Sequence, residues 1–331
     1  ARPPAGSPGP PRPSRSQRLP RAAARIEATV STDGDRVAPS VIKRILDEEF
    51  ADEETSWESG DAHEACEIAV THLLLRYGRL MNTAARTAGD TSLDAFVEAV
   101  AKAEPRIRGR SNRHDTLQHY ATPLEIAWAM ATAADIEAGE TVLDPSAGTG
   151  TLLAMAHLAQ PACRLRACEG DLRRWDLLTH AAPGIQVVQG DTFRLEERMP
   201  TWTGHHEVVL LNPPFSRRLG SRGRHRNEDL RHLMAASKAS APGGVIVALL
   251  GAGTTPREAA WEKIVDGRLH LMWSTLIDGA LMKNREAKIT TRLCILRNEE
   301  EDDAFDPRTD TERHTEAGTL LDAVRGATGQ A

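Results

Sequence analysis

Apolar residues recur along this chain with two different spacings. Between about residues 38 and 106 they stand three and four positions apart, as in PSVIKRILDEEF, ACEIAVTHLLLRYGRLM and TSLDAFVEAVAKA. This spacing predicts amphipathic helices. After about residue 117, short apolar runs alternate with helix-like segments such as TLLAMAHLA and DLRRWDLLTHA. Strands that alternate with helices are typical of a parallel sheet covered on both faces.

The short apolar runs define the strands that we expect. They lie at 141–144, 164–169, 185–191, 207–212, 244–251, 269–278 and 289–297. No long helix separates the last two runs, so we expect them to form an antiparallel hairpin beside the parallel strands. The predicted fold class is therefore α/β, with a mostly parallel sheet that follows a small helical domain.

Both ends of the chain lack a regular apolar pattern. Residues 1–37 begin with a stretch rich in Pro, Arg and Ser, and we expect this tail to be disordered. Residues 299–331 open with the acidic run NEEEDDAFDPRTDTERHTEAG and are expected to form a polar tail. Between the tails, we assign 38–110 to a helical N-terminal domain and 111–298 to the α/β domain.

Composition excludes several classes of function. The 331 residues carry a formal charge of −6, so a nucleic-acid partner would need a local basic surface. No apolar stretch is long enough to span a membrane and no signal peptide opens the chain, so we expect a cytoplasmic protein without a membrane partner. The four cysteines form neither a CxxC pair nor a zinc-ligand spacing, and we expect no metal.

A glycine-containing turn, LDPSAGTGTLL, follows the first expected strand. Asp144 closes this strand, and Gly148 and Gly150 make the turn into the next helix. A phosphate-binding loop would carry Lys and Ser or Thr after its last glycine, and a dinucleotide loop would carry a third glycine where Leu153 stands. The turn therefore favours a nucleoside ligand that has no pyrophosphate.

Acidic residues close the next two strands as well. Glu169 follows the turn by about 20 residues, the usual distance for a carboxylate that accepts hydrogen bonds from ribose hydroxyls. Asp171 is the alternative for this role, although it lies past the strand end. Asp191 closes the third strand, where it can accept from an adenine amino group. Three strand-end acids near one glycine turn suit S-adenosyl-L-methionine.

The fourth expected strand ends in the tetrapeptide NPPF. The side-chain oxygen of Asn212 and the carbonyl of Pro213 can both accept hydrogen bonds, and Pro213 and Pro214 make the turn rigid. Two such acceptors can hold both N–H groups of an exocyclic amine, which directs the nitrogen lone pair at an electrophilic methyl group. Phe215 offers a face for stacking on a planar base. A structural Pro–Pro turn beside an incidental Asn is the alternative.

The order DPSAGTG and then NPPF resembles the amino-methyltransferases that modify adenine N6 in DNA. Upstream, LQHYATPLEIAWAM resembles the segment of that group which covers the methionine part of the cofactor. The resemblance implies a Rossmann-like, seven-stranded methyltransferase sheet and a catalytic set of Asn212, Pro213, Pro214 and Phe215. It implies cofactor contacts from Gln118, Tyr120, Thr122, Pro123, Asp144, Ser146, Ala147, Gly148, Gly150, Glu169, Asp191 and Asn212.

A closer resemblance, from about residue 40 to 298, is to methyltransferase domains fused to strawberry-notch-type helicases on plasmids and phages. It includes SWESGDAHEACEIA, PGGVIVALLGAG and the stretch from TLIDGALMK to TTRLCILRN. The helicase region of those proteins is absent here, so the chain is either a stand-alone version or a severed domain.

The chain also has little room for target recognition. Only about 115 residues follow NPPF, too few for a large target-recognition domain. Sequence specificity is therefore weak or supplied by another chain, such as a separate helicase or specificity subunit. DNA itself is the expected partner, and we expect Arg217, Arg218, Arg222, Arg224 and Arg226 to contact its phosphates. A solvated loop is the alternative for this arginine-rich segment.

Three functions remain open on these residues. The first is N6-adenine methylation of DNA by a site-specific, S-adenosylmethionine-dependent enzyme. The second is methylation of another amine or amide, in an RNA base or a protein glutamine. The third is a non-catalytic, methyltransferase-like binding module within a larger helicase or defence assembly.

Overall fold

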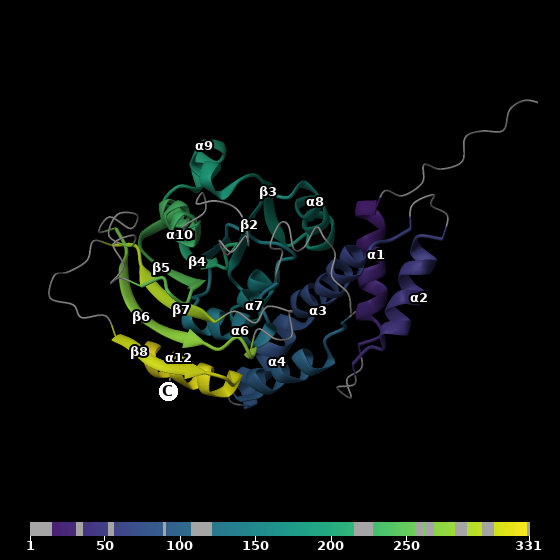
Figure 1. Cartoon of the computed structure of the whole chain (residues 1–331), viewed down its shortest axis with the longest axis horizontal. Helices are drawn as coiled ribbons and strands as arrows, with labels where there is room; N and C mark the ends of the chain where they lie inside the picture. The colour runs from purple at the N-terminus through teal and green to yellow at the C-terminus, as the bar shows by residue number, and fades with distance from the viewer. Residues whose placement is uncertain are drawn as a thin grey trace, which may run out of the picture.

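The structure, a computed structural model, describes residues 15–30, 36–51, 56–88, 91–106, 121–214, 228–255, 261, 268–281, 290–299 and 308–329. An eight-stranded sheet with the order β3-β2-β1-β4-β5-β7-β6-β8 forms its centre (Figure 1). The strands are β1 (Thr141–Asp144), β2 (Arg164–Glu169), β3 (Ile185–Gln189), β4 (His206–Leu211), β5 (Ser240–Gly251), β6 (His270–Ile277), β7 (Thr291–Arg297) and β8 (Arg308–His314).

The direction of the strands confirms the predicted α/β class. Strands β1 to β5 run parallel to one another, and β7 is antiparallel to both β5 and β6. The expected hairpin is thus the β6–β7 pair. Strands β1 and β2 have the bounds that the sequence pattern gave. Every residue of β1 is buried, and β2 buries Leu165, Ala167 and Cys168 between its polar ends.

The C-terminal segment corrects two predictions, the strand count and the polar tail. Strand β8 pairs in parallel with β6 at the sheet edge and makes an eighth strand. Helix α12 (Ala317–Thr328) then buries Leu320, Leu321 and Val324. Its Arg325 donates from both terminal nitrogens to the Asp94 carboxylate, at 2.8 and 2.9 Å. The acidic composition of 299–331 concealed a strand that has little apolar character.

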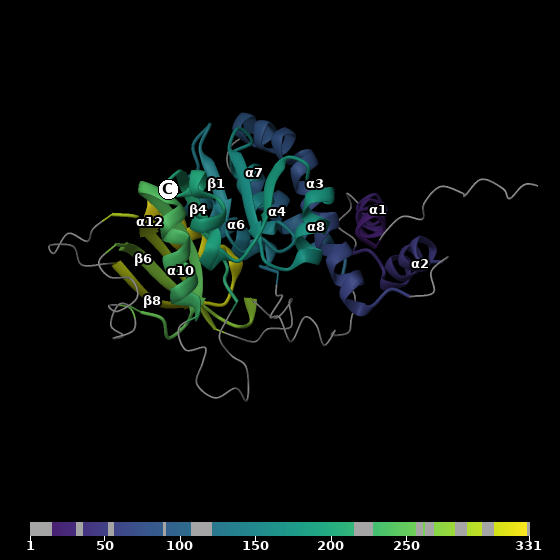
Figure 2. The same ribbon diagram turned by 90° about the horizontal axis from the view of Figure 1, so that it is seen from above.

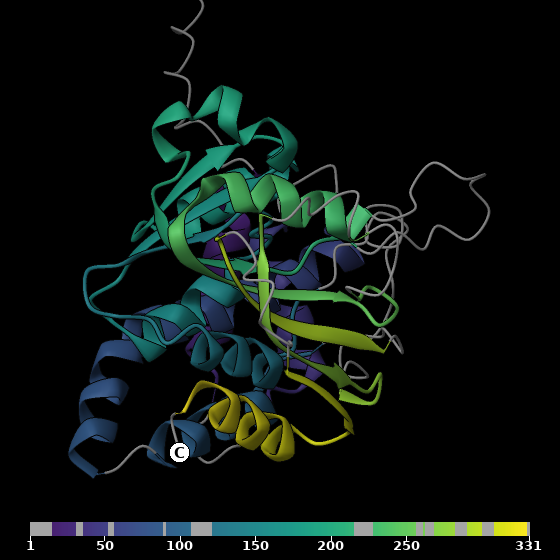
Figure 3. The same ribbon diagram turned by 90° about the vertical axis from the view of Figure 1, so that its left-hand side faces the viewer.

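Helices cover both faces of the sheet. On one face lie α6 (Leu124–Ala133), α7 (Thr151–Ala159), α8 (Leu172–Ala181) and α12, and on the other lies α10 (Glu228–Ala239). Figure 3 shows α10 in green and α12 in yellow on opposite sides of the strands. The neighbours Leu210 and Leu211 of β4 are both fully buried, and they point into the two different cores. Within the described residues, no helix is long and apolar enough to cross a membrane.

The predicted N-terminal helices are confirmed by α2 (Pro39–Glu49), α3 (Ser59–Ala88) and α4 (Thr91–Ala103). Helices α3 and α4 pack against α7 and α6, and α1 (Arg15–Glu27) and α2 lie outermost (Figures 1 and 2). Helix α1 (Arg15–Glu27) corrects the expectation of a disordered tail for these residues. Its buried apolar side chains are Leu19, Ala22, Ala23 and Ile26, which share one face and pack in a core with α3 and α8.

Candidate active site

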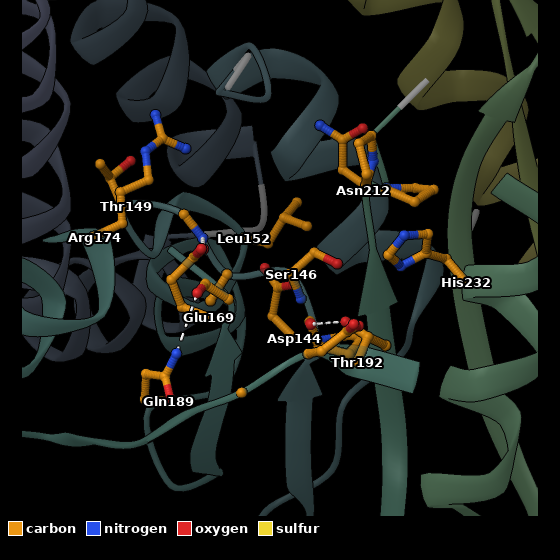
Figure 4. Close-up of a pocket in the computed structure, with 18 of the residues that line it drawn as sticks. Asp144, Ser146, Thr149, Leu152, Glu169, Arg174, Gln189, Thr192, Asn212 and His232 are labelled. Carbon is orange, nitrogen blue, oxygen red and sulfur yellow. Dashed lines mark hydrogen bonds between the residues drawn. The ribbon is translucent and has the colours of Figure 1, made fainter. Parts of the chain in front are cut away.

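A cavity of about 510 Å³ opens at the carboxyl ends of β1 to β4 (Figure 4). This is the edge at which open α/β sheets bind ligands, and the volume is in the range of a small-molecule site. Many predicted residues line it: Thr122, Asp144, Ser146, Ala147, Gly148, Glu169, Asp191, Asn212, Pro213 and Pro214. Pro123 and Gly150 lie next to lining residues but do not line the cavity themselves.

The glycine turn between β1 and α7 needs both of its glycines. Gly148 and Gly150 have positive φ angles of 54° and 86°, which side chains disfavour. A Cβ on Gly150 would also lie only 2.9 Å from the Leu178 side chain of α8. Gly148 donates its backbone N–H to Oε2 of Glu169 at 2.7 Å. The turn and the carboxylate at the end of β2 are therefore held together.

Glu169 and Asp171, the two candidates for the ribose carboxylate, have different surroundings. Glu169 lines the cavity, and each of its carboxylate oxygens accepts one backbone N–H at 2.7 Å. Each oxygen keeps a second lone pair for a ligand. Asp171 instead caps helix α8 and accepts from the N–H groups of Arg173 and Arg174. This arrangement favours Glu169 as the ligand-binding acid.

Asp191 follows β3 and also begins a short helix, η1 (Thr192–Arg194). Its Oδ1 accepts from the N–H of Phe193 at 3.0 Å. The carboxylate lies at the cavity wall, exposed to solvent. It therefore keeps an oxygen that can accept from an amino group of a ligand.

Asp144 is buried beneath the turn and titrates near neutral pH. Burial raises the pKa of its carboxyl from 3.8 to about 7, the charge of Glu169 adds to the rise, and the N–H of Ser146 opposes it. Ser146 N donates to Oδ1 at 2.9 Å. A cation brought into the cavity would favour the ionised form, because the opposite charge would stabilise the carboxylate.

Asn212 stands immediately after β4, at the cavity wall. Its Nδ2 donates to Oγ1 of Thr122 at 2.8 Å, which fixes the orientation of the amide. Its Oδ1 is buried and has no hydrogen-bond partner among the described residues. A buried acceptor without a donor is unfavourable, and an incoming N–H group would satisfy it. The side chain can thus accept a hydrogen bond from a ligand.

Comparison with known proteins shows the fold of the chain. No family model and no curated protein matches the sequence. A Listeria monocytogenes protein, described as a class I S-adenosylmethionine-dependent methyltransferase, matches with a TM-score of 0.52 and 14% identity, over 95% of this chain and 98% of its own. The chain has the class I methyltransferase fold.

Two further solved structures are less similar. The methyltransferase subunit of a type I restriction-modification system from Streptococcus thermophilus has a TM-score of 0.48 and 14% identity, over 94% of this chain and 93% of its own. A modification subunit of a type I restriction enzyme from Vibrio vulnificus has a TM-score of 0.46 and 15% identity, over 88% of this chain and 61% of its own.

Within this methyltransferase fold, sequence reasoning missed several residues that line the cavity, among them Arg174 and His232. Arg174 comes from α8 and His232 from α10. The His232 ring lies 4.4 Å from the Phe193 ring, and burial lowers the pKa of His232. Both belong to segments whose apolar spacing predicts a helix and nothing more, so no local signal marks them as site residues.

Several predicted residues lie outside the described part of the chain. They are Gln118, Tyr120, Phe215, Arg217, Arg218, Arg222, Arg224 and Arg226. Their assignments therefore stay predictions. Among the residues that the structure describes, no group of His, Cys, Asp and Glu is placed to hold a metal ion.

Proposed function

We propose that the protein transfers a methyl group from S-adenosyl-L-methionine to the N6 amine of adenine in DNA. The observation that carries this proposal is the buried Oδ1 of Asn212 at the wall of the cavity, which has no donor among the described residues. The amide is oriented by Thr122 and is followed by two prolines that line the same cavity. This arrangement supports recognition of an amine opposite the glycine turn.

The lining residues fit the cofactor. Glu169 would accept from the ribose hydroxyls and Asp191 from the adenine amino group, while the carboxylate of Asp144 would face the cationic amino-acid part. S-adenosylmethionine, when bound, supplies an electrophilic methyl group on a sulfonium. The chain itself needs only to position donor and acceptor in line and to exclude water.

The amine is the second part of the proposal. Oδ1 of Asn212 and the carbonyl of Pro213 would each accept one N–H of the target amine. With both hydrogens held, the nitrogen lone pair leaves conjugation with the ring and points at the methyl group. Because the amine becomes acidic only after transfer, no strong general base is required.

DNA as the substrate is supported by the resemblance carried by DPSAGTG and NPPF. An adenine within a duplex cannot reach the cavity, so it would have to flip out, at a cost of a few kcal/mol. The choice of target site would come from a separate helicase or specificity subunit, or would be weak.

Labelled S-adenosylmethionine tests the proposal directly. The protein is incubated with duplex DNA, RNA or protein extract, and we expect label in DNA, as N6-methyladenine on nucleoside analysis. Asn212→Ala should abolish transfer yet keep its affinity for S-adenosylhomocysteine, measured by calorimetry. Label in RNA or protein would replace the proposed substrate. Cofactor binding without transfer to any of the three would indicate a non-catalytic module.

A further inference from the structure

Arg174 is a buried cation at the wall of the cavity. Only 5% of its side chain is exposed, although it lines the cavity beside the glycine turn. A Cβ built on Gly148 would lie 3.1 Å from its Nη1. Figure 4 shows Arg174 beside Thr149, on the opposite side of the cavity from Asn212 and His232. The guanidinium therefore lies against the glycine turn, at the wall of the cavity.

Two nitrogens of the Arg174 guanidinium have hydrogen-bonding capacity that the described residues do not use. Its Nε and Nη2 are buried without a hydrogen-bond partner there. Glu64 and Glu67 of α3 lie 3.6 and 3.8 Å from these two nitrogens, which is close enough for an ion pair and too far for a good hydrogen bond. A buried guanidinium left in this state is costly unless a ligand completes its contacts.

The two glutamates are committed to other partners. Oε2 of Glu64 lies 2.7 Å from Nη2 of Arg173, and Oε2 of Glu67 accepts from the Thr149 hydroxyl at 3.0 Å. Burial also raises the pKa of Glu64, and the charges of Arg174 and Arg173 oppose the rise. The carboxylates thus hold the guanidinium in place and leave it able to bind an anion.

The other lining arginines are less suited to that role. Nε of Arg194 bonds Oε2 of Glu197 at 3.0 Å, and 62% of its side chain is exposed. Arg198 is exposed, and its Nη1 contacts the backbone oxygen of Gln189 at 3.4 Å. Among the described arginines of the cavity, Arg174 is the buried one. A buried cation attracts an anion more strongly than an exposed one, because water screens it less.

We propose that Arg174 binds the carboxylate of the amino-acid part of the cofactor. The assignment rests on the proposed function for the identity of that cofactor. The ligand-facing acids Asp144, Glu169 and Asp191 suit an ammonium, hydroxyls and an amine, and the single carboxylate of the cofactor needs a cationic partner. Arg174 supplies that partner next to the glycine turn, with Glu64 and Glu67 as positioning residues.

Two ligands that differ by one carboxylate test the assignment. Calorimetry compares S-adenosylmethionine with its decarboxylated form, which keeps the sulfonium and the ammonium. The wild type should prefer the carboxylated ligand, and Arg174→Met should reduce this preference about ten- to one-hundredfold while affinity for the decarboxylated ligand changes little. Arg173→Met is the matched control, because Arg173 belongs to the same ion cluster but does not line the cavity.

Each of the other outcomes would count against the assignment of Arg174 to the cofactor carboxylate. An equal loss of affinity for both ligands in Arg174→Met would show that Arg174 supports the ribose or the turn, and would overturn the assignment. If Arg174→Met does not fold, Arg174→Lys keeps the charge near the two glutamates and should lose part of the preference; an unchanged preference would also overturn it. A wild type that binds neither ligand would instead refute the proposed function, and the assignment with it.

Discussion

Thr122 and Asn212 stand 90 residues apart in the sequence, and their side chains are joined by a hydrogen bond of 2.8 Å. Thr122 lies just before α6, and Asn212 just after β4. The bond uses the Nδ2 of Asn212, and the Oδ1 has no donor in the part of the chain that the structure describes. The Thr122 hydroxyl thus determines which end of the amide is available to a substrate.

Thr122→Val should therefore slow methyl transfer. Valine keeps the volume but removes the acceptor, so the amide of Asn212 loses its fixed orientation. We expect the single-turnover rate at saturating cofactor to fall about tenfold or more, the equivalent of one hydrogen bond or more. Thr122→Ser retains the hydroxyl and should restore most of the rate. An unchanged rate in Thr122→Val would show that the bond does not orient the amide during transfer.

Asp144 should make cofactor affinity depend on pH. Its pKa of about 7 in the folded protein means that the carboxyl is largely protonated at pH 6 and ionised at pH 8. The cationic cofactor favours the ionised form, so binding below pH 7 must release a proton. Affinity should rise about tenfold from pH 6 to pH 8 and level off above that.

Calorimetry in buffers of different ionisation enthalpy counts the released protons. The number should approach one at pH 6 and zero at pH 8. Asp144→Asn has no carboxyl to titrate, and its affinity should lose most of this dependence on pH. Equal affinities at pH 6 and pH 8 in the wild type would contradict the role given to Asp144.

Sequence patterns predicted the elements that the local spacing of apolar residues defines. Thr141–Asp144 and Arg164–Glu169 were placed correctly, because β1 is buried throughout and the buried Leu165, Ala167 and Cys168 mark β2 in the sequence. The strand-end acids followed from that placement. Helix α1 was missed although Leu19 and Ile26 lie on one apolar face, since the Pro- and Arg-rich composition around them indicated disorder. Its stability comes from packing against α3, which no local pattern reports.

The parts of the site that sequence did not reveal are contacts between distant segments. Arg174 and Glu67 come from two helices, and the bond between Glu67 and Thr149 joins residues 82 positions apart. Strand β8 is an edge strand, and its sequence RTDTERH contains no apolar residue that would mark it. In each case the tertiary neighbour, and not the local sequence, supplies the information.

Leu320 tests whether the C-terminal helix belongs to the folded core. It is fully buried, so Leu320→Ala should lower the free energy of unfolding by about 2–5 kcal/mol. Leu80 on α3 is 64% exposed, and Leu80→Ala should change it by about 0.5 kcal/mol or less. Urea unfolding of both variants measures the difference. Similar small effects would show that α12 adds little to stability.

Thr71 tests the link between α3 and the glycine turn. Its hydroxyl donates to the backbone oxygen of Thr149 at 3.0 Å, and both groups are buried. Thr71→Val keeps the shape but leaves that oxygen unpaired, so cofactor affinity should fall by about five- to tenfold. The control is Thr83→Val, because the exposed Thr83 hydroxyl only bonds the Arg79 oxygen of its own helix. Equal cofactor affinities in the two variants would show that the bond between Thr71 and Thr149 does not support cofactor binding.

The grip of α3 on Thr149 also limits how this protein can be engineered. Glu67 and Thr71 hold the turn from a helix that precedes β1 by more than fifty residues, so a truncation that begins at β1 would remove both anchors. The sheet with its loops should therefore not be transferred by itself to another DNA-targeting protein. Any chimera should carry the chain from α1 onward, with fusion partners joined beyond it.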